Sequence, residues 1–146
     1  MKDIFKIIIV VASIGATATC ALPLMSVYSG GMESCTLFVN GYNLMSFSAW
    51  GCVPMLATLL IPFILFGKQS GKVQEAELLF LVIANAVCYV HSFNAAREWL
   101  RSVGDSMINY HYGAVIYPLG FIGVLLLVKC FELFFKDEPC KEVKCA

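Results

Sequence analysis

The sequence predicts an all-α integral membrane protein, with four transmembrane helices in a bundle and a short extracytoplasmic β-hairpin between the first two. Hydrophobic residues make up 60% of the 146 positions and charged residues only 14%, too few for the surface of a soluble domain. Four apolar runs each approach the roughly 20 residues that a spanning helix needs. We expect one membrane domain over 1-146, with helices at about 4-25, 48-66, 76-100 and 110-134, an outer loop at 26-47 and a cytoplasmic tail at 136-146.

The first apolar run, Ile4–Met25, has two readings. A basic start followed by apolar and then small residues also fits a cleaved signal peptide covering residues 1-21. We favour a retained helix because small residues recur on one helical face, where they allow close approach of a neighbouring helix. That stripe consists of Ala12, Gly15, Ala16 and Thr19.

The outer loop carries a hairpin signal. Asn40-Gly41 separates two β-prone runs, Cys35–Val39 and Tyr42–Phe47, and Asn-Gly in that setting favours a two-residue turn with positive φ at both positions. We therefore expect the hairpin to turn at Asn40-Gly41. The alternative is an irregular loop lying on the lipid headgroups.

The second and fourth runs contain residues typical of membrane helices. Pro54 and Pro62 lie within the second run and Pro118 lies within the fourth. A proline removes a backbone donor, which membrane helices tolerate when neighbouring groups satisfy the freed carbonyl. Trp50 and Tyr110 stand at the expected outer ends, where an aromatic belt is common.

The third run, Glu77–Arg101, combines an apolar span with many polar side chains. Polar groups in hydrocarbon are costly, so they usually face other helices or a cavity. We expect Asn85, His91 and Asn94 in particular to face protein. The candidate polar functional face comprises Asn85, Cys88, Tyr89, His91, Ser92, Asn94, Arg97 and Glu98.

The basic residues predict the orientation. Eight of the ten fall on one side of a four-span topology and two, Arg97 and Arg101, fall on the other. The positive-inside rule then places both termini in the cytoplasm, within the cell (inner) membrane. The eight are Lys2, Lys6, Lys68, Lys72, Lys129, Lys136, Lys141 and Lys144.

Histidines and cysteines provide the remaining candidate chemistry. His91 and His111 are the two histidines, and on facing helices they would be weak candidates to bind haem iron or a transition metal. An oxidising outer compartment would permit a disulfide between Cys35 and either Cys20 or Cys52. We predict no cofactor, with haem or a metal as the alternative.

Function is less sharply indicated than architecture. Ten basic residues balance ten acidic ones, which removes the electrostatic basis for nucleic-acid binding, and no catalytic motif appears. Four spans with a β-rich first outer loop are similar to claudin-like architecture, but loop 26-47 lacks that family's Trp and paired-Cys signature, so no family is assigned. We expect a non-enzymatic assembly, accessory or recognition subunit that contacts the lipid bilayer and another membrane protein or its own copies. The alternative is a redox or metal- or haem-handling membrane protein that uses His91 and His111.

Overall fold

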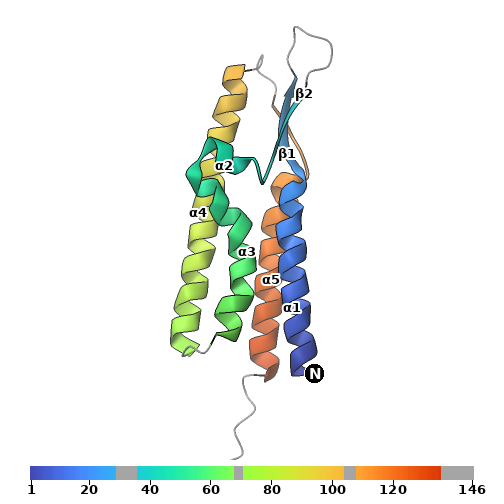
Figure 1. The fold of residues 1–146 in the computed structure, drawn as a ribbon, viewed down its shortest axis with the longest axis vertical. Helices are drawn as coiled ribbons and strands as arrows, with labels where there is room; N and C mark the ends of the chain where they lie inside the picture. Colours follow the sequence, from blue (N-terminus) through green and yellow to red (C-terminus); the bar gives the residue numbers. More distant parts are fainter. Residues whose placement is uncertain (29–35, 68–70, 104–107, 136–146) are drawn as a thin grey trace, which may run out of the picture.

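Four long helices lie side by side along the longest axis of the molecule (Figure 1). They are α1 (Lys2–Ala18), α3 (Cys52–Phe66), α4 (Gly71–Val103) and α5 (Gly113–Phe135). The computed structural model describes residues 1–28, 36–67, 71–103 and 108–135. Within these ranges, four helical segments are long and apolar enough to cross a membrane.

The ends of all four long helices differ from the expected ones, and the second begins at Cys52 rather than at residue 48. The first helix continues through a 3-10 turn, η1 (Thr19–Ala21), and stops before residue 25 because Pro23 opens a strand. A residue that precedes proline is disfavoured in helical conformation, so Leu22 is extended, with ψ of 145°. The expected third helix is longer than predicted, and the fourth begins at Gly113 rather than at residue 110.

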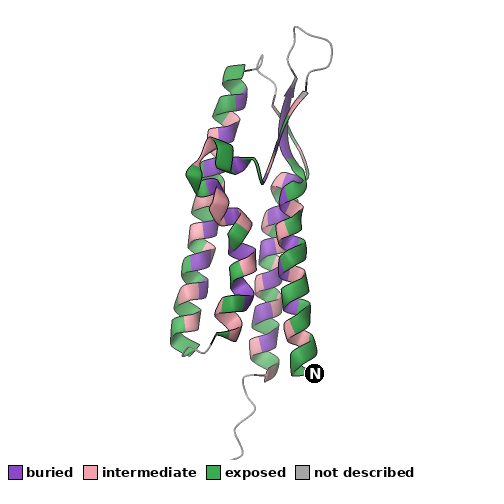
Figure 2. Cartoon of the chain, in the orientation of Figure 1, coloured by how far each residue is buried: buried purple, intermediate pink, exposed green. Residues whose placement is uncertain are grey.

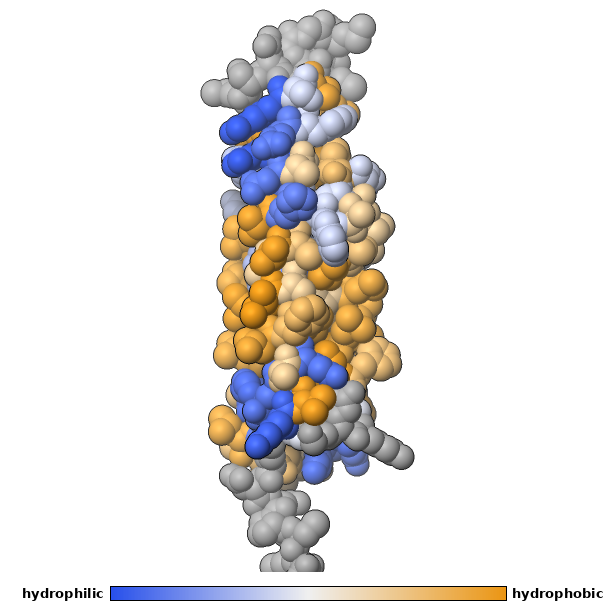
Figure 3. All heavy atoms as spheres, turned by 90° about the vertical axis from the view of Figure 1, so that its left-hand side faces the viewer, coloured by the Kyte–Doolittle hydropathy of each residue, from blue (hydrophilic) through white to orange (hydrophobic). Residues whose placement is uncertain are grey.

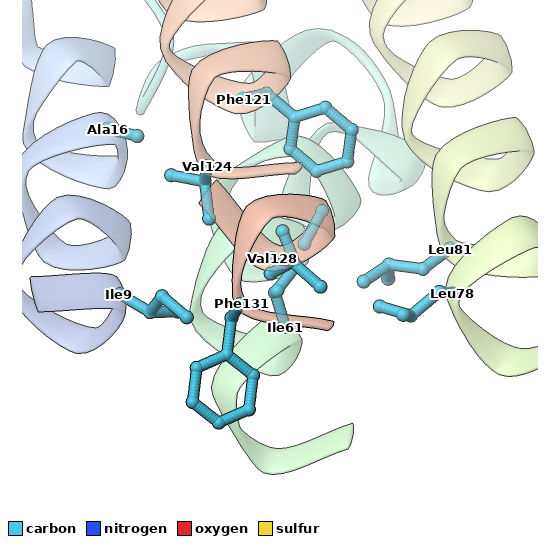
Figure 4. Packing of buried hydrophobic residues seen from close by; sticks show 10 residues of the cluster. Ile9, Ala16, Ile61, Leu78, Leu81, Phe121, Val124, Val128 and Phe131 are labelled. Carbon is cyan, nitrogen blue, oxygen red and sulfur yellow. The ribbon is translucent and has the colours of Figure 1, made fainter. Parts of the chain in front are cut away.

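The four long helices share one hydrophobic core. Ile9 of α1, Ile61 of α3, Leu81 of α4 and Val124 of α5 point toward one another (Figure 4). All four of these side chains are buried, and the buried positions in each helix recur at the helical period, which gives each helix one face toward the others. The start of α1 and the end of α5 lie at the same end of the molecule (Figure 1), which we call the terminal end.

A three-stranded sheet occupies the opposite end. The strands are β1 (Pro23–Tyr28), β2 (Thr36–Asn40) and β3 (Ile108–Tyr110), in the order β2-β1-β3. Both pairings are antiparallel, with Met25 opposite Val39 on one side and opposite Tyr110 on the other. Antiparallel strands do lie between the first two long helices, but the third strand from residues 108–110 was not expected.

The predicted position of the hairpin turn is wrong. Asn40-Gly41 does not join two strands, because β2 pairs with the preceding strand β1, and a short helix, α2 (Leu44–Phe47), follows the turn. The Gly41 backbone does not adopt the left-handed φ predicted for it. Glycine is required there for another reason, since a Cβ at position 41 would lie 2.8 Å from the Cβ of Cys20.

A second hydrophobic core joins the sheet to the far part of α4. Figure 2 shows that the buried stripe of α4 continues beyond the level of α3 toward the sheet. Val27, Leu44 and Leu100 bring strand, α2 and α4 together in this core, each 1% exposed or less. We call the cap the unit formed by β1, β2, β3, α2 and residues 92–103 of α4.

The cap explains why α4 is so long. With 33 residues the helix extends about 50 Å, against a bilayer hydrocarbon core of about 30 Å. Figure 3, viewed toward α4, shows a hydrophobic belt between two hydrophilic regions. The last part of the predicted central span, from residue 92 on, therefore belongs to the cap, where side chains pack against a sheet rather than against other long helices.

Candidate functional site

The first group of polar contacts lies between the long helices. The Tyr117 hydroxyl of α5 lies 2.8 Å from Oδ1 of Asn85 and within hydrogen-bonding distance of the Pro54 carbonyl oxygen of α3. A hydroxyl carries one proton, so it can donate to only one of these oxygens. It satisfies both neighbours when it donates to Pro54 and the Asn85 amide donates to it, an orientation of the amide that is a matter of assignment.

The Tyr89 hydroxyl replaces the backbone donor that Pro118 removes from α5. Pro118 has no N–H, so the carbonyl of Ala114, four residues earlier, loses its helical donor. The Tyr89 hydroxyl of α4 donates to that carbonyl over 3.0 Å. The Ala114 carbonyl thus receives a hydrogen bond from the neighbouring helix α4, which is the condition under which membrane helices tolerate proline.

A chain of hydroxyls connects α3 to α1. Oγ1 of Thr58 lies 2.5 Å from Oγ1 of Thr17, which donates to the Ser13 carbonyl, and the Ser13 hydroxyl in turn donates to the Ile9 carbonyl. Because Thr17 uses its own proton on Ser13, Thr58 must be the donor in the interhelical bond. Sequence reasoning missed both Tyr117 and this chain, although isolated hydroxyls within apolar runs are the signal that marks such pairs.

The predicted polar face of α4 does not come together as one site. Asn85 and Ser92 are buried, Cys88, Asn94 and Arg97 are half-buried, and His91 and Glu98 are exposed. The prediction that His91 faces protein is therefore wrong, because it lies beside the buried stripe and not within it. Within the described ranges, the hydroxyl of Ser92 and Nε of Arg97 have no hydrogen-bond partner.

His111 lies in the cap on the sheet. Its Nε2 is 2.7 Å from the hydroxyl of Ser26 in the central strand, and its backbone N–H donates to the carbonyl of Leu24. The ring of Phe38 lies beside the imidazole, with centroids 5.9 Å apart. One ring nitrogen of His111 is therefore engaged with a strand residue rather than free to ligate.

Of the three cysteines in the predicted disulfide, Cys20 and Cys52 lie within the described residues. Cys20 and Cys52 are free thiols, and Cys52 donates to the Ala49 carbonyl. The predicted disulfide involves Cys35, which lies outside the described residues. In residues 1–28, 36–67, 71–103 and 108–135, no group of three or more His, Cys, Asp or Glu side chains is arranged to hold a metal ion.

One face of the sheet is exposed on its two edge strands, whereas Ser26 on the central strand is buried. Phe38 is opposite Ser26, and Ser26 is opposite Asn109, so these three side chains share a face, and His111 joins them through Ser26. Phe38 is 58% exposed and Asn109 is exposed, whereas the other face packs on α4 through Phe93, whose ring stacks on Tyr110 at 6.1 Å. We call Ser26, Phe38, Asn109 and His111 the outer sheet face.

The outer sheet face combines three kinds of side-chain group. It offers the Phe38 ring on β2, the Asn109 amide on β3 and the His111 imidazole, and both strands are hydrogen-bonded to the central strand β1. Aromatic side chains are enriched at protein interfaces. Comparison of the chain with protein-family models, with curated proteins and with solved structures finds no match.

Proposed function

We propose that the chain is a multi-pass membrane protein whose cap recognises another membrane protein through the outer sheet face. The membrane part rests on four apolar helices and on the hydrophobic belt between two hydrophilic regions in Figure 3. Phe63 of α3 and Phe80 of α4 are 77% and 73% exposed on these helices, and such exposure is costly in water but favourable in lipid.

The position of Phe38 is the observation that carries the recognition role. Its ring is 58% exposed in the middle of β2, on a strand that also supplies Val39 to the second core. A large ring held on a rigid support loses little conformational entropy when a partner covers it. Interfaces concentrate their binding energy in a few such aromatic anchors.

The proposed orientation places the cap outside and the terminal end in the cytoplasm. It follows from the eight-to-two division of basic residues and the positive-inside rule. The start of α1 and the end of α5 share one end of the molecule (Figure 1), as this orientation requires. A metal or haem site has less support, since Nε2 of His111 is held by Ser26 and His91 is exposed on α4.

The test compares two exposed aromatic residues of the cap end. Phe38→Ser removes the anchor, and Tyr112→Ser is the matched control because Tyr112 is 87% exposed but lies outside the sheet. After mild detergent extraction, we expect Phe38→Ser to shift the native mass of the complex toward the monomer while its helical circular dichroism is unchanged. Tyr112→Ser should retain the wild-type mass. Equal masses for wild type and Phe38→Ser would refute the role of the outer sheet face.

A further inference from the structure

A cleft of about 740 Å³ opens on the cap, away from the outer sheet face. Trp99 of α4 and Phe47 of α2 form its aromatic walls, with ring centroids 5.1 Å apart and planes inclined at 52°. Trp99 is 42% exposed, so part of the indole faces the opening. The lining consists of Ser46, Phe47, Ala95, Glu98, Trp99 and Ser102.

The walls of the cleft are held in place by the second core. Leu44, three residues before Phe47, and Leu100, the residue after Trp99, are both fully buried, and Phe47 itself packs against that core. The Ser102 hydroxyl donates to the Trp99 carbonyl over 2.7 Å. The two rings therefore belong to fixed segments that pack on each other, and binding against their exposed faces requires little reorganisation.

Glu98 gives the cleft a negative charge. Its side chain is exposed, and the ion pairs among the described residues, Lys6 with Asp3 and Lys129 with Glu132, leave it out. A carboxylate disfavours an anion, and aromatic faces attract cations through their quadrupole. Two rings and a carboxylate around one opening therefore favour a cationic ligand, above all a quaternary ammonium group.

The position of the cleft along α4 indicates the source of that ligand. This step rests on the membrane placement proposed above. Val90 is 57% exposed on α4 and precedes Trp99 by nine residues, about 13 Å of helix. Long side chains lean back over the preceding turn, so the indole lies about 8 Å beyond Val90. The headgroup layer is about 5 to 8 Å thick on each side of the hydrocarbon. With Val90 taken as the last lipid-facing residue of α4, the rings lie at the level of lipid headgroups.

We propose that this cleft binds the choline headgroup of phosphatidylcholine in the outer leaflet. The quaternary ammonium lies against Trp99 and Phe47, with the Glu98 carboxylate as its counter-ion. The methyl groups of choline match the apolar walls, and its charge matches Glu98. The role is distinct from partner recognition by the outer sheet face, but it depends on the same membrane placement.

A paramagnetic cation tests the cleft in detergent that contains no choline. Trp50→Phe leaves Trp99 as the single tryptophan, and Trp99→Phe leaves Trp50, 60% exposed, as the matched control. TEMPO-choline is expected to quench Trp99 fluorescence along a saturating curve that free choline reverses, while the neutral nitroxide TEMPOL quenches it linearly. Glu98→Gln should weaken the apparent affinity about fivefold or more. Linear quenching of equal slope by both nitroxides would overturn the proposal.

Bilayers then test the lipid as the source. Nanodiscs of phosphatidylglycerol containing a few per cent of TEMPO-labelled phosphatidylcholine should quench Trp99 more than a random lipid distribution allows. Glu98→Gln should remove the excess without altering the quenching of Trp50. Quenching at the random level despite binding of TEMPO-choline in detergent would exclude the lipid headgroup. The detergent titration does not depend on membrane topology or on Phe38, so failure of the cleft is distinguishable from failure of the proposed function.

Discussion

Replacing Tyr117 with Phe is expected to loosen the contact of α5 with α3 and α4 without changing the shape of the core. The ring is 1% exposed and keeps its packing, whereas the lost hydroxyl serves both Asn85 and the Pro54 carbonyl. Leaving a buried polar group unpaired costs about 1–3 kcal/mol in proteins, but interhelical hydrogen bonds in membranes average about 0.6 kcal/mol and reach about 1.7.

The burial of Asn85 decides between these two scales. Its side chain is 5% exposed and has Tyr117 as its hydrogen-bond partner among the described residues, so little water or lipid can replace the lost contact. We expect Tyr117→Phe to lower the free energy of unfolding by about 1–1.7 kcal/mol, near the upper end of the membrane range. Reversible unfolding in mixed micelles, followed by circular dichroism, measures this difference.

A double-mutant cycle separates the hydrogen bond from packing. Asn85→Leu removes the amide, and Tyr117→Phe in that background should cost at least about 0.5 kcal/mol less than it does alone, as expected for residues in direct contact. Additive costs, or a Tyr117→Phe change below about 0.3 kcal/mol, would show that the hydroxyl does not hold the three helices together.

Three further predictions concern other positions. Gly41→Ala should destabilise the protein by about 1–3 kcal/mol, because its Cβ would lie 2.9 Å from the Cys20 carbonyl oxygen. The control Gly15→Ala, whose Cβ meets no atom within 4 Å, should be neutral or stabilising by up to about 1 kcal/mol. Thermal unfolding compares the two variants, and equal losses of stability would contradict the close approach at Gly41. Tyr89→Phe should cost about 0.6 kcal/mol in the native sequence and less in a Pro118→Ala background, where the Ala114 carbonyl regains a helical donor; an unchanged cost by the same unfolding assay would mean that Tyr89 acts through packing alone. In a cysteine-free background, Asn43→Cys should react with an impermeant reagent on intact cells and Lys2→Cys should not, and the reverse pattern would invert the proposed orientation.

The apolar helices could be predicted from sequence because hydropathy and length report them directly. Hydropathy failed at the boundary of the first helix, where Leu24 and Met25 are apolar for a different reason: they are fully buried in a strand of the second core. A run that passes from a helix into a buried strand keeps the same composition. Pro23 was the available signal, since it disfavours helix in the preceding residue.

The contacts of the candidate sites depended on pairings that sequence periodicity does not encode. Asn40-Gly41 matches a hairpin turn locally, yet β2 pairs with the strand before it, and Gly41 meets Cys20, about twenty residues away. β3 spans three residues, too few for an alternating pattern. Asn85 was identified as a polar residue facing protein, but its partner Tyr117 comes from a helix that the chain reaches only after α4 ends.

The two cores divide α4 into two parts with different packing partners. Its first part packs in the core shared by the long helices and its last part in the core of the cap, so in a membrane one end of a single rigid rod would be stabilised by lipid packing and the other by water. Urea acts on surface that water reaches, so it would open the cap before it affects the spanning part. In that placement, α4 would be a single helix that connects an aqueous cap to the spanning part of the protein.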